Sequence, residues 1–127
     1  MNTNGKARIL VAEDDAVNQY IIEKMLDDEK YELFIVNDGL EVFDEIKDND
    51  FDLILMDVHM PNMDGVEATE KIRKKEEKTG KHIPIIGITA YTHEVDKDEY
   101  INIGMDEFLP KPFLDKNLKE VVNRFIA

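Results

Sequence analysis

Four apolar runs in this chain each end at a polar residue or cluster, and together these carry the groups that phosphoryl transfer needs. The run "ILVA" ends at Glu13-Asp14-Asp15, "LILM" at Asp57, "IIGI" at Thr89 and "EFLP" at Lys111. Side chains at the carboxyl ends of neighbouring parallel strands meet at one edge of a sheet. We therefore expect an acidic cluster, a lone aspartate, a hydroxyl and an ammonium at a common site.

An acidic cluster of this kind requires a proton or a cation. Two carboxylates about 4 Å apart repel by roughly 4 kcal/mol at an effective dielectric constant of about 20. The candidate ligands are oxygen atoms, because the chain has no Cys and its three His are not clustered, and such a set suits Mg²⁺ better than zinc or copper. With Lys111 as a second positive charge and Thr89 as a hydroxyl donor, the pattern predicts phosphoryl transfer to Asp57.

The sequence also limits which molecules could donate the phosphoryl group and which classes of partner the chain could bind. No Gly-rich phosphate loop of the G-x-x-x-x-G-K-[ST] kind is present, so the phosphoryl group should come from another protein or a small acyl phosphate. The net charge of −13 argues against direct binding of nucleic acid. No apolar run approaches the roughly 18 residues of a membrane helix, and the N-terminus lacks the apolar region of a signal peptide. We expect a cytoplasmic protein with no membrane contact.

Hydrophobic patterning predicts strands that alternate with helices. Apolar runs predict strands at 7–12, 31–36, 51–56, 83–89 and 107–109. Helical periodicity predicts helices at 16–28, 40–48, 66–78, 93–103 and 116–126. Strands that are almost wholly apolar indicate a parallel sheet covered on both faces. The prediction is an α/β fold, a doubly wound, flavodoxin-like five-stranded parallel sheet in the order 2-1-3-4-5. It forms one domain over residues 1–127, with 1–6 as a short flexible tail.

Several helix ends and faces can also be predicted. Asp64 and Glu67 resemble a capping box, and Gly80 should end the helix that they begin. Side chains suited to cap helix starts are Asn37 and Asp38 before the second helix, Thr92 before the fourth and Asp115 before the fifth. In the first helix, Val17, Ile21 and Met25 recur at four-residue spacing with Ile22 and Leu26 beside them, and should face the core. The predicted inward residues of the other helices are Val42, Phe43 and Ile46, and Leu118, Val121, Val122 and Phe125.

The segments "ILVAEDDAVN", "LILMDVHMPNMDG", "IPIIGITA" and "GMDEFLPKPF" occur in an order and spacing that resemble a response-regulator receiver domain. The resemblance covers essentially the whole chain and is strongest to receiver modules of hybrid sensor histidine kinases. It implies a signalling switch of a two-component phosphorelay that takes a phosphoryl group from a histidine kinase or a histidine phosphotransfer protein. It also implies that the chain catalyses only its own phosphorylation and dephosphorylation.

The resemblance implies a role for each matching residue. Asp57 would be the phosphoacceptor, Asp14 would bind Mg²⁺ directly, Glu13 would do so through water, and the backbone carbonyl of His59 would complete the protein ligands. Thr89 would bond to the phosphoryl oxygen, and Lys111 would pair with the phosphoryl group. Phe108 would be the switch aromatic, where many relatives carry Tyr. Together with Thr89 it would bias the face formed by the fourth helix, the fifth strand and the fifth helix, which presents Tyr91, Tyr100, Ile101 and Phe113 to an effector.

Two other functions fit parts of the pattern. A phosphatase of the aspartyl type would use a second carboxylate two residues after the nucleophile, but His59 stands there. A constitutive interaction module could keep the fold without phosphorylation, although the complete acidic set disfavours it. A Mg²⁺ titration without effect would favour this second alternative.

Overall fold

Strands and helices alternate along the residues that the computed structural model describes, which are 6–27, 29–89, 97–110 and 115–126. The strands are β1 (Ala7–Ala12), β2 (Tyr31–Val36), β3 (Leu53–Asp57), β4 (Ile85–Thr89) and β5 (Glu107–Pro110). The helices are α1 (Ala16–Met25), α2 (Gly39–Asp48), α3 (Gly65–Thr79), α4 (Lys97–Ile103) and α5 (Asp115–Ile126). Within those residues no helix is long and apolar enough to cross a bilayer.

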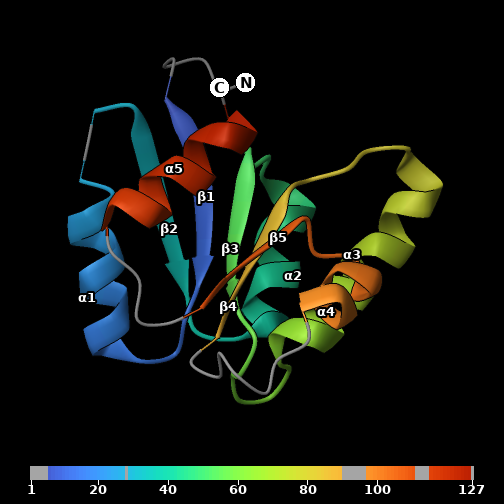
Figure 1. Cartoon of the computed structure of the whole chain (residues 1–127). Coiled ribbons are helices and arrows are strands. Elements are labelled where there is room, and N and C mark those ends of the chain that lie inside the picture. Colours follow the sequence, from blue (N-terminus) through green and yellow to red (C-terminus); the bar gives the residue numbers. More distant parts are fainter. Residues whose placement is uncertain (1–5, 28, 90–96, 111–114, 127) are drawn as a thin grey trace.

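The strands form one parallel sheet in the order β2-β1-β3-β4-β5, which confirms the predicted topology. Helices α1 and α5 cover one face, and α2, α3 and α4 lie on the other (Figure 1). The order of the sheet reverses between β1 and β3, so the carboxyl ends of these two strands flank the crevice in which such folds bind ligands.

Burial on both faces explains the apolar strands. Successive side chains of a strand point to opposite faces. Ile9 and Val11 accordingly join the core under α1 and α5, while Leu10 and Ala12 join the core under α2 and α3. All four are at most 1% exposed. An unbroken apolar run therefore marks a strand in the middle of the sheet.

Most predicted helix ends are confirmed. Asp38 caps α2 by accepting a hydrogen bond from the Glu41 amide at 2.9 Å, and Asp64 caps α3 by accepting one from the Glu67 amide at 2.8 Å. The carboxylate of Glu67 lies 3.4 Å from Nζ of Lys71, so it forms an ion pair along α3. Helix α3 ends at Gly80, which has φ 74°, a left-handed conformation that glycine adopts without strain.

The prediction for the first helix was wrong in its length, and its inner face is confirmed only in part. Helix α1 ends at Met25, and Val17 is 63% exposed while Ile21 is 38% exposed. The inner face is formed by Ile22 and Leu26, with Met25 partly buried. Sheet and α5 cover only one side of this helix, so the apolar stripe that includes Val17 and Ile21 turns to solvent.

Smaller differences concern strand starts and the last helices. The third strand begins at Leu53 and the fourth at Ile85, two residues later than predicted, while Phe51 and Ile83 still pack against the core. Asp115 is the first residue of α5 rather than the residue before it. The predicted inner residues of α2 and α5 are buried or partly buried. The predicted tail (apart from Lys6) and the predicted cap Thr92 lie outside the described residues.

Candidate functional site

Three carboxylates converge at the crevice between β1 and β3. One oxygen from each of Glu13, Asp14 and Asp57 lies within 4.8 Å of the other two. The register explains this, because Ala12 pairs with Met56 and the next residue of each strand therefore arrives at the same level. Glu13 is 2% exposed and Asp57 is 6% exposed, whereas Asp14 is exposed. The sequence predicted this grouping correctly.

This donor set fits Mg²⁺. Three carboxylates at this spacing repel one another, and the repulsion favours a bound cation. A small, hard cation that retains some of its waters needs few protein oxygens, and two of these carboxylates are held in place by burial. The residues present could therefore hold a Mg²⁺ ion.

The loop after β3 fixes the orientation of Asp57. The amide of His59 donates a hydrogen bond to Oδ1 of Asp57 at 3.0 Å, and the amide of Val58 donates to the carbonyl of Ile88 at 2.9 Å. The loop then folds back onto the end of β3, where the amide of Gly65 donates to the carbonyl of Val58 at 2.9 Å. Gly65 lies so close that a Cβ atom there would collide with the backbone carbonyl of Asp57. Only glycine allows this approach.

The same loop is tied to the start of α2. Nδ2 of Asn62 donates to Oδ2 of Asp38 at 2.7 Å, and the amide of Gly39 donates to the carbonyl of Met63 at 2.9 Å. The hydrogen bond from Asn62 holds the pKa of Asp38 below its ordinary value, the backbone N–H groups of Glu41 and Leu40 add to this, and burial opposes it. The sequence predicted Asp38 as a cap but gave no sign of its bond to Asn62.

Gln19 is a further residue that the sequence analysis missed. Its Nε2 donates to the carbonyl of Glu13 at 2.5 Å and to Oδ1 of Asn37 at 2.9 Å. It therefore connects the loop after β1 with the loop after β2, and holds the backbone that carries Glu13 and Asp14. The available signal was its position one turn into α1, a helix that begins three residues after Glu13.

The structure describes some, but not all, of the remaining predicted site residues. Thr89 ends β4 directly after Ile88, which pairs with Asp57, so its backbone lies at the same edge of the sheet. Phe108 lies in β5, is partly buried and pairs with Gly87. The side chain of His59 is exposed. Lys111 lies outside the described residues, as do Tyr91 and Phe113, so its predicted role stays a prediction.

Glu13, Asp14 and Asp57 lie where the strand order of a five-stranded α/β sheet reverses. This fold and this group of carboxylates together define a class of protein. The family model for the response regulator receiver domain matches residues 9–123. The chain belongs to this family.

Curated relatives and a solved structure agree with that assignment. The chain is 40% identical over 125 residues to hybrid signal transduction histidine kinase I of Dictyostelium discoideum, which covers 94% of the chain and 7% of that protein. It is 36% identical over 116 residues to the sensor histidine kinase GacS of Pseudomonas protegens, covering 91% of the chain and 13% of the relative. The chain thus spans a small part of both relatives.

One structural neighbour is the receiver domain of the sensor histidine kinase PA1611 from Pseudomonas aeruginosa. Its crystal structure has a TM-score of 0.84 and 36% identity, and the match covers 95% of this chain and 98% of that one. That structure has a magnesium ion coordinated in its active-site cleft.

Proposed function

We propose that this chain is a phosphorelay switch in which Asp57 accepts a phosphoryl group from a phosphohistidine. The observation that supports this most directly is the convergence of Glu13, Asp14 and Asp57 within 4.8 Å at the crevice of the sheet. An oxygen of the Asp57 carboxylate attacks phosphorus, the P–N bond breaks, and its electron pair stays on the imidazole nitrogen, which takes up a proton. The product is an aspartyl phosphate.

Each part of the site contributes to that step. The His59 amide holds one oxygen of Asp57 in place, which leaves the carboxylate oriented for attack. Glu13 and Asp14 would hold Mg²⁺ together with Asp57 and the His59 carbonyl, and the ion would offset negative charge on the phosphoryl oxygens. Thr89 and Lys111 are the proposed contacts of the phosphoryl group. The chain catalyses only its own modification, in the cytoplasm, and turns over no other substrate.

The donor is a histidine kinase or a histidine phosphotransfer protein, and we place its docking site on α1. Val17, Tyr20 and Ile21 are 63%, 60% and 38% exposed on that helix. Helix α1 begins two residues after Asp14, so these apolar side chains lie on the helix that directly follows the acidic residues of the loop. Exposed apolar patches beside a reactive group are suited to a partner that must bring its own group there.

Phosphorylation would be read out on the face formed by α4, β5 and α5. It adds about 1.5 to 2 negative charges at Asp57. Thr89 and Phe108 would shift an existing equilibrium of this face, on which Ile101 of α4 is 38% exposed. An effector that binds one of the two states would then sense the phosphoryl group.

Intact mass spectrometry tests the proposal. With acetyl phosphate and Mg²⁺ the chain should gain one phosphoryl group, and it should gain none without Mg²⁺. The Asp57→Asn variant should gain none under either condition. Stoichiometric modification of that variant would show that Asp57 is not the acceptor. A wild-type chain that is never modified would instead favour a constitutive interaction module with the receiver fold.

A further inference from the structure

Gln19 holds the peptide group that joins Glu13 to Asp14. Its Nε2 lies 2.5 Å from the carbonyl oxygen of Glu13, and that carbonyl belongs to the same planar unit as the amide nitrogen of Asp14. Rotation of this unit turns the backbone that carries both acidic side chains. The bond from Gln19 therefore acts on two of the three carboxylates that have oxygens within 4.8 Å of one another.

This bond takes the place of a sheet hydrogen bond. The paired residues of β1 and β2 end at Ala12 and Val36, and the amide of Glu13 still donates to the carbonyl of Val36 at 3.0 Å. Beyond this point the two segments diverge, since β1 leads into α1 on one face of the sheet and β2 leads into α2 on the other (Figure 1). The carbonyl of Glu13 accordingly accepts a hydrogen bond from a side chain and not from a neighbouring strand.

The second hydrogen bond of Gln19 goes to an acceptor that is itself held in place. Nε2 of Gln19 donates to Oδ1 of Asn37 at 2.9 Å. The backbone amide of Asn37 in turn donates to Oε1 of Glu41, in the first turn of α2, at 2.5 Å. The side-chain amide of Gln19 is therefore bound on one side to the loop that carries the acidic residues and on the other to the start of α2.

The start of α1 brings Gln19 to this position. Asp15 caps the helix by accepting a hydrogen bond from the amide of Asn18 at 3.3 Å, and the amide of Gln19 donates to the carbonyl of Asp15 at 2.9 Å. Helical side chains lean toward the N-terminus of their helix, so Gln19 reaches back to Glu13. Glutamine supplies two N–H donors from one neutral nitrogen, and both bonds therefore form without a positive charge next to a site for a cation.

Mg²⁺ is more sensitive than Ca²⁺ to the placement of its ligands. It requires nearly ideal octahedral geometry at about 2.0–2.1 Å, whereas Ca²⁺ accepts about six to eight oxygens at about 2.3–2.6 Å in flexible arrangements. A backbone that fixes Glu13 and Asp14 thus favours the smaller ion, and a backbone that lets them shift favours it less. Groups that orient metal ligands without touching the metal typically change affinity by about 10- to 100-fold.

We propose that Gln19 is a positioning residue that raises the affinity of the acidic site for Mg²⁺ relative to Ca²⁺. It does so by fixing the peptide group between Glu13 and Asp14 against the start of α2. The inference rests on the proposed function, in which these two residues and Asp57 hold Mg²⁺. It does not depend on which molecule donates the phosphoryl group.

Isothermal titration calorimetry of the full chain with Mg²⁺ and with Ca²⁺ tests this role. Gln19→Met keeps the length of the side chain and removes both hydrogen bonds, so the Kd for Mg²⁺ should rise about tenfold and the Kd for Ca²⁺ by less than about threefold. Asn18→Met alters the neighbouring side chain in the same turn and leaves the bonds of Gln19 in place. This control should bind both ions as the wild type does, and urea denaturation verifies that each variant is folded under the conditions of the titration.

Asn37 provides a second test of the same role. Asn37→Ala removes the outer acceptor and should weaken Mg²⁺ binding, though less than Gln19→Met does, whereas Asn37→Asp keeps an acceptor oxygen and should not weaken it. The double variant Gln19→Met with Asn37→Ala should bind Mg²⁺ as Gln19→Met alone does, because Asn37 acts through Gln19. The proposal is overturned if the two substitutions are additive, if Gln19→Met binds Mg²⁺ as tightly as the wild type, or if it loses affinity for both ions by the same factor.

The Asp14→Asn variant separates this inference from the proposed function. If the wild type binds neither ion, or if Asp14→Asn binds Mg²⁺ as tightly as the wild type, the Mg²⁺ site itself is wrong and both proposals fail. If Mg²⁺ binding requires Asp14 but the ratio of the two Kd values is the same in Gln19→Met and the wild type, only the role of Gln19 is overturned.

Discussion

The backbone N–H of His59 donates to Oδ1 of Asp57 at 3.0 Å, so the residue two positions after Asp57 orients this carboxylate through the main chain. The side chain of His59 is exposed and plays no part in this contact. The tight return of the loop at Gly65 keeps that amide in place, because the Gly65 amide bonds to Val58. The orientation of the Asp57 carboxylate therefore depends on the shape of the loop between β3 and α3.

Gly65→Ala should destabilise the fold and impair phosphorylation together. The added Cβ would collide with the Asp57 carbonyl and with Cγ of Met56, and overpacking of this kind costs about 1–3 kcal/mol. Chemical denaturation and the rate of modification by acetyl phosphate would measure the two effects. Gly80→Ala is the control, because nothing lies within 4 Å of its Cβ position and only its φ of 74° is unfavourable. It should cost about 1 kcal/mol and leave phosphorylation unchanged. Equal loss of phosphorylation in both variants would contradict the role of Gly65.

Asp14→Asn should raise the thermal stability of the metal-free chain and remove its response to Mg²⁺. Repulsion among Glu13, Asp14 and Asp57 weakens the folded state without a cation, and the substitution removes one of the three charges. Binding of Mg²⁺ to the folded wild type should raise its melting temperature as the Mg²⁺ concentration rises. Differential scanning calorimetry with and without Mg²⁺ checks both effects. A variant that melts lower than the wild type without Mg²⁺, or that keeps the full Mg²⁺ response, would refute this account.

Removing the apolar surface of α1 should slow phosphotransfer from a protein donor and leave phosphorylation by acetyl phosphate unchanged. The double variant Val17→Ser with Tyr20→Ser alters two side chains that are 63% and 60% exposed, so its stability should change by less than about 0.5 kcal/mol. We expect transfer from a phosphorylated histidine donor to fall about tenfold or more. Ile101→Ser on α4 is the matched control and should transfer normally. Equal loss with acetyl phosphate would indicate damage to the site itself.

The grouping of the acids could be predicted because strand ends place them. Once "ILVA" and "LILM" are assigned as neighbouring parallel strands, Glu13 and Asp57 must meet, whatever the loops do. The same reasoning could not find Gln19 or Asn62. Their hydrogen bonds depend on the path of two loops, including the positive φ of 64° at Asn62, and no periodic pattern encodes that path.

Helical periodicity alone could not predict which side chains of α1 are buried. The spacing of Val17, Ile21 and Met25 gives an apolar stripe, but it does not say how much of the stripe the sheet and α5 will cover. The structure covers Ile22 and Leu26 and leaves Val17 and Ile21 exposed. On our proposal that α1 is the docking surface of the donor, this helix carries more apolar residues than the core needs, and the sequence alone cannot separate the two sets.

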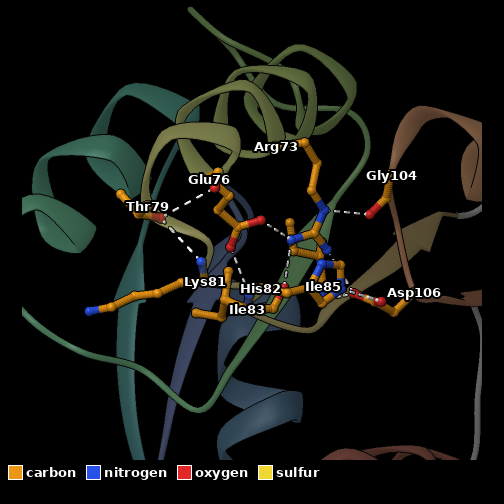
Figure 2. A network of polar contacts seen from close by, with 9 residues as sticks. All are labelled: Arg73, Glu76, Thr79, Lys81, His82, Ile83, Ile85, Gly104 and Asp106. Atoms are coloured by element: carbon orange, nitrogen blue, oxygen red, sulfur yellow. Dashed lines mark hydrogen bonds and ion pairs between the residues drawn. The ribbon is translucent and has the colours of Figure 1, made fainter.

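Arg73→Met should lower the stability of the fold by about 2–3 kcal/mol, because it removes the guanidinium that contacts the partly buried carboxylates of Glu76 and Asp106 (Figure 2). The side chains of Arg73, Glu76 and Asp106 are 16%, 14% and 22% exposed. Lys71→Met on the same helix removes an exposed ion pair with Glu67 and should cost less than about 0.5 kcal/mol. Urea denaturation of both variants measures the difference. Similar losses would show that the Arg73 network stabilises no more than a surface pair.

Asn62→Gly should raise the pKa of Asp38 and reduce the dependence of stability on acidic pH. The bond from Asn62 is the main cause of the lowered pKa, followed by the N–H of Glu41. A carboxyl whose pKa is lower in the folded state stabilises the fold at pH values above its unfolded pKa, near 3.8. That stabilisation is lost as the pH falls through the folded pKa. The variant should therefore be less stable than the wild type at neutral pH, and the difference should shrink below about pH 3.8.

Carboxyl NMR titration of Asp38 and urea denaturation at several pH values measure the two effects. Glycine keeps the positive φ of position 62 without strain, so this substitution isolates the hydrogen bond. Asn62→Ala removes the same bond and adds backbone strain, which does not depend on pH. Its stability curve should therefore run parallel to that of Asn62→Gly at a lower level. An unchanged pKa of Asp38 in either variant would show that the amide of Asn62 does not stabilise the ionised carboxylate.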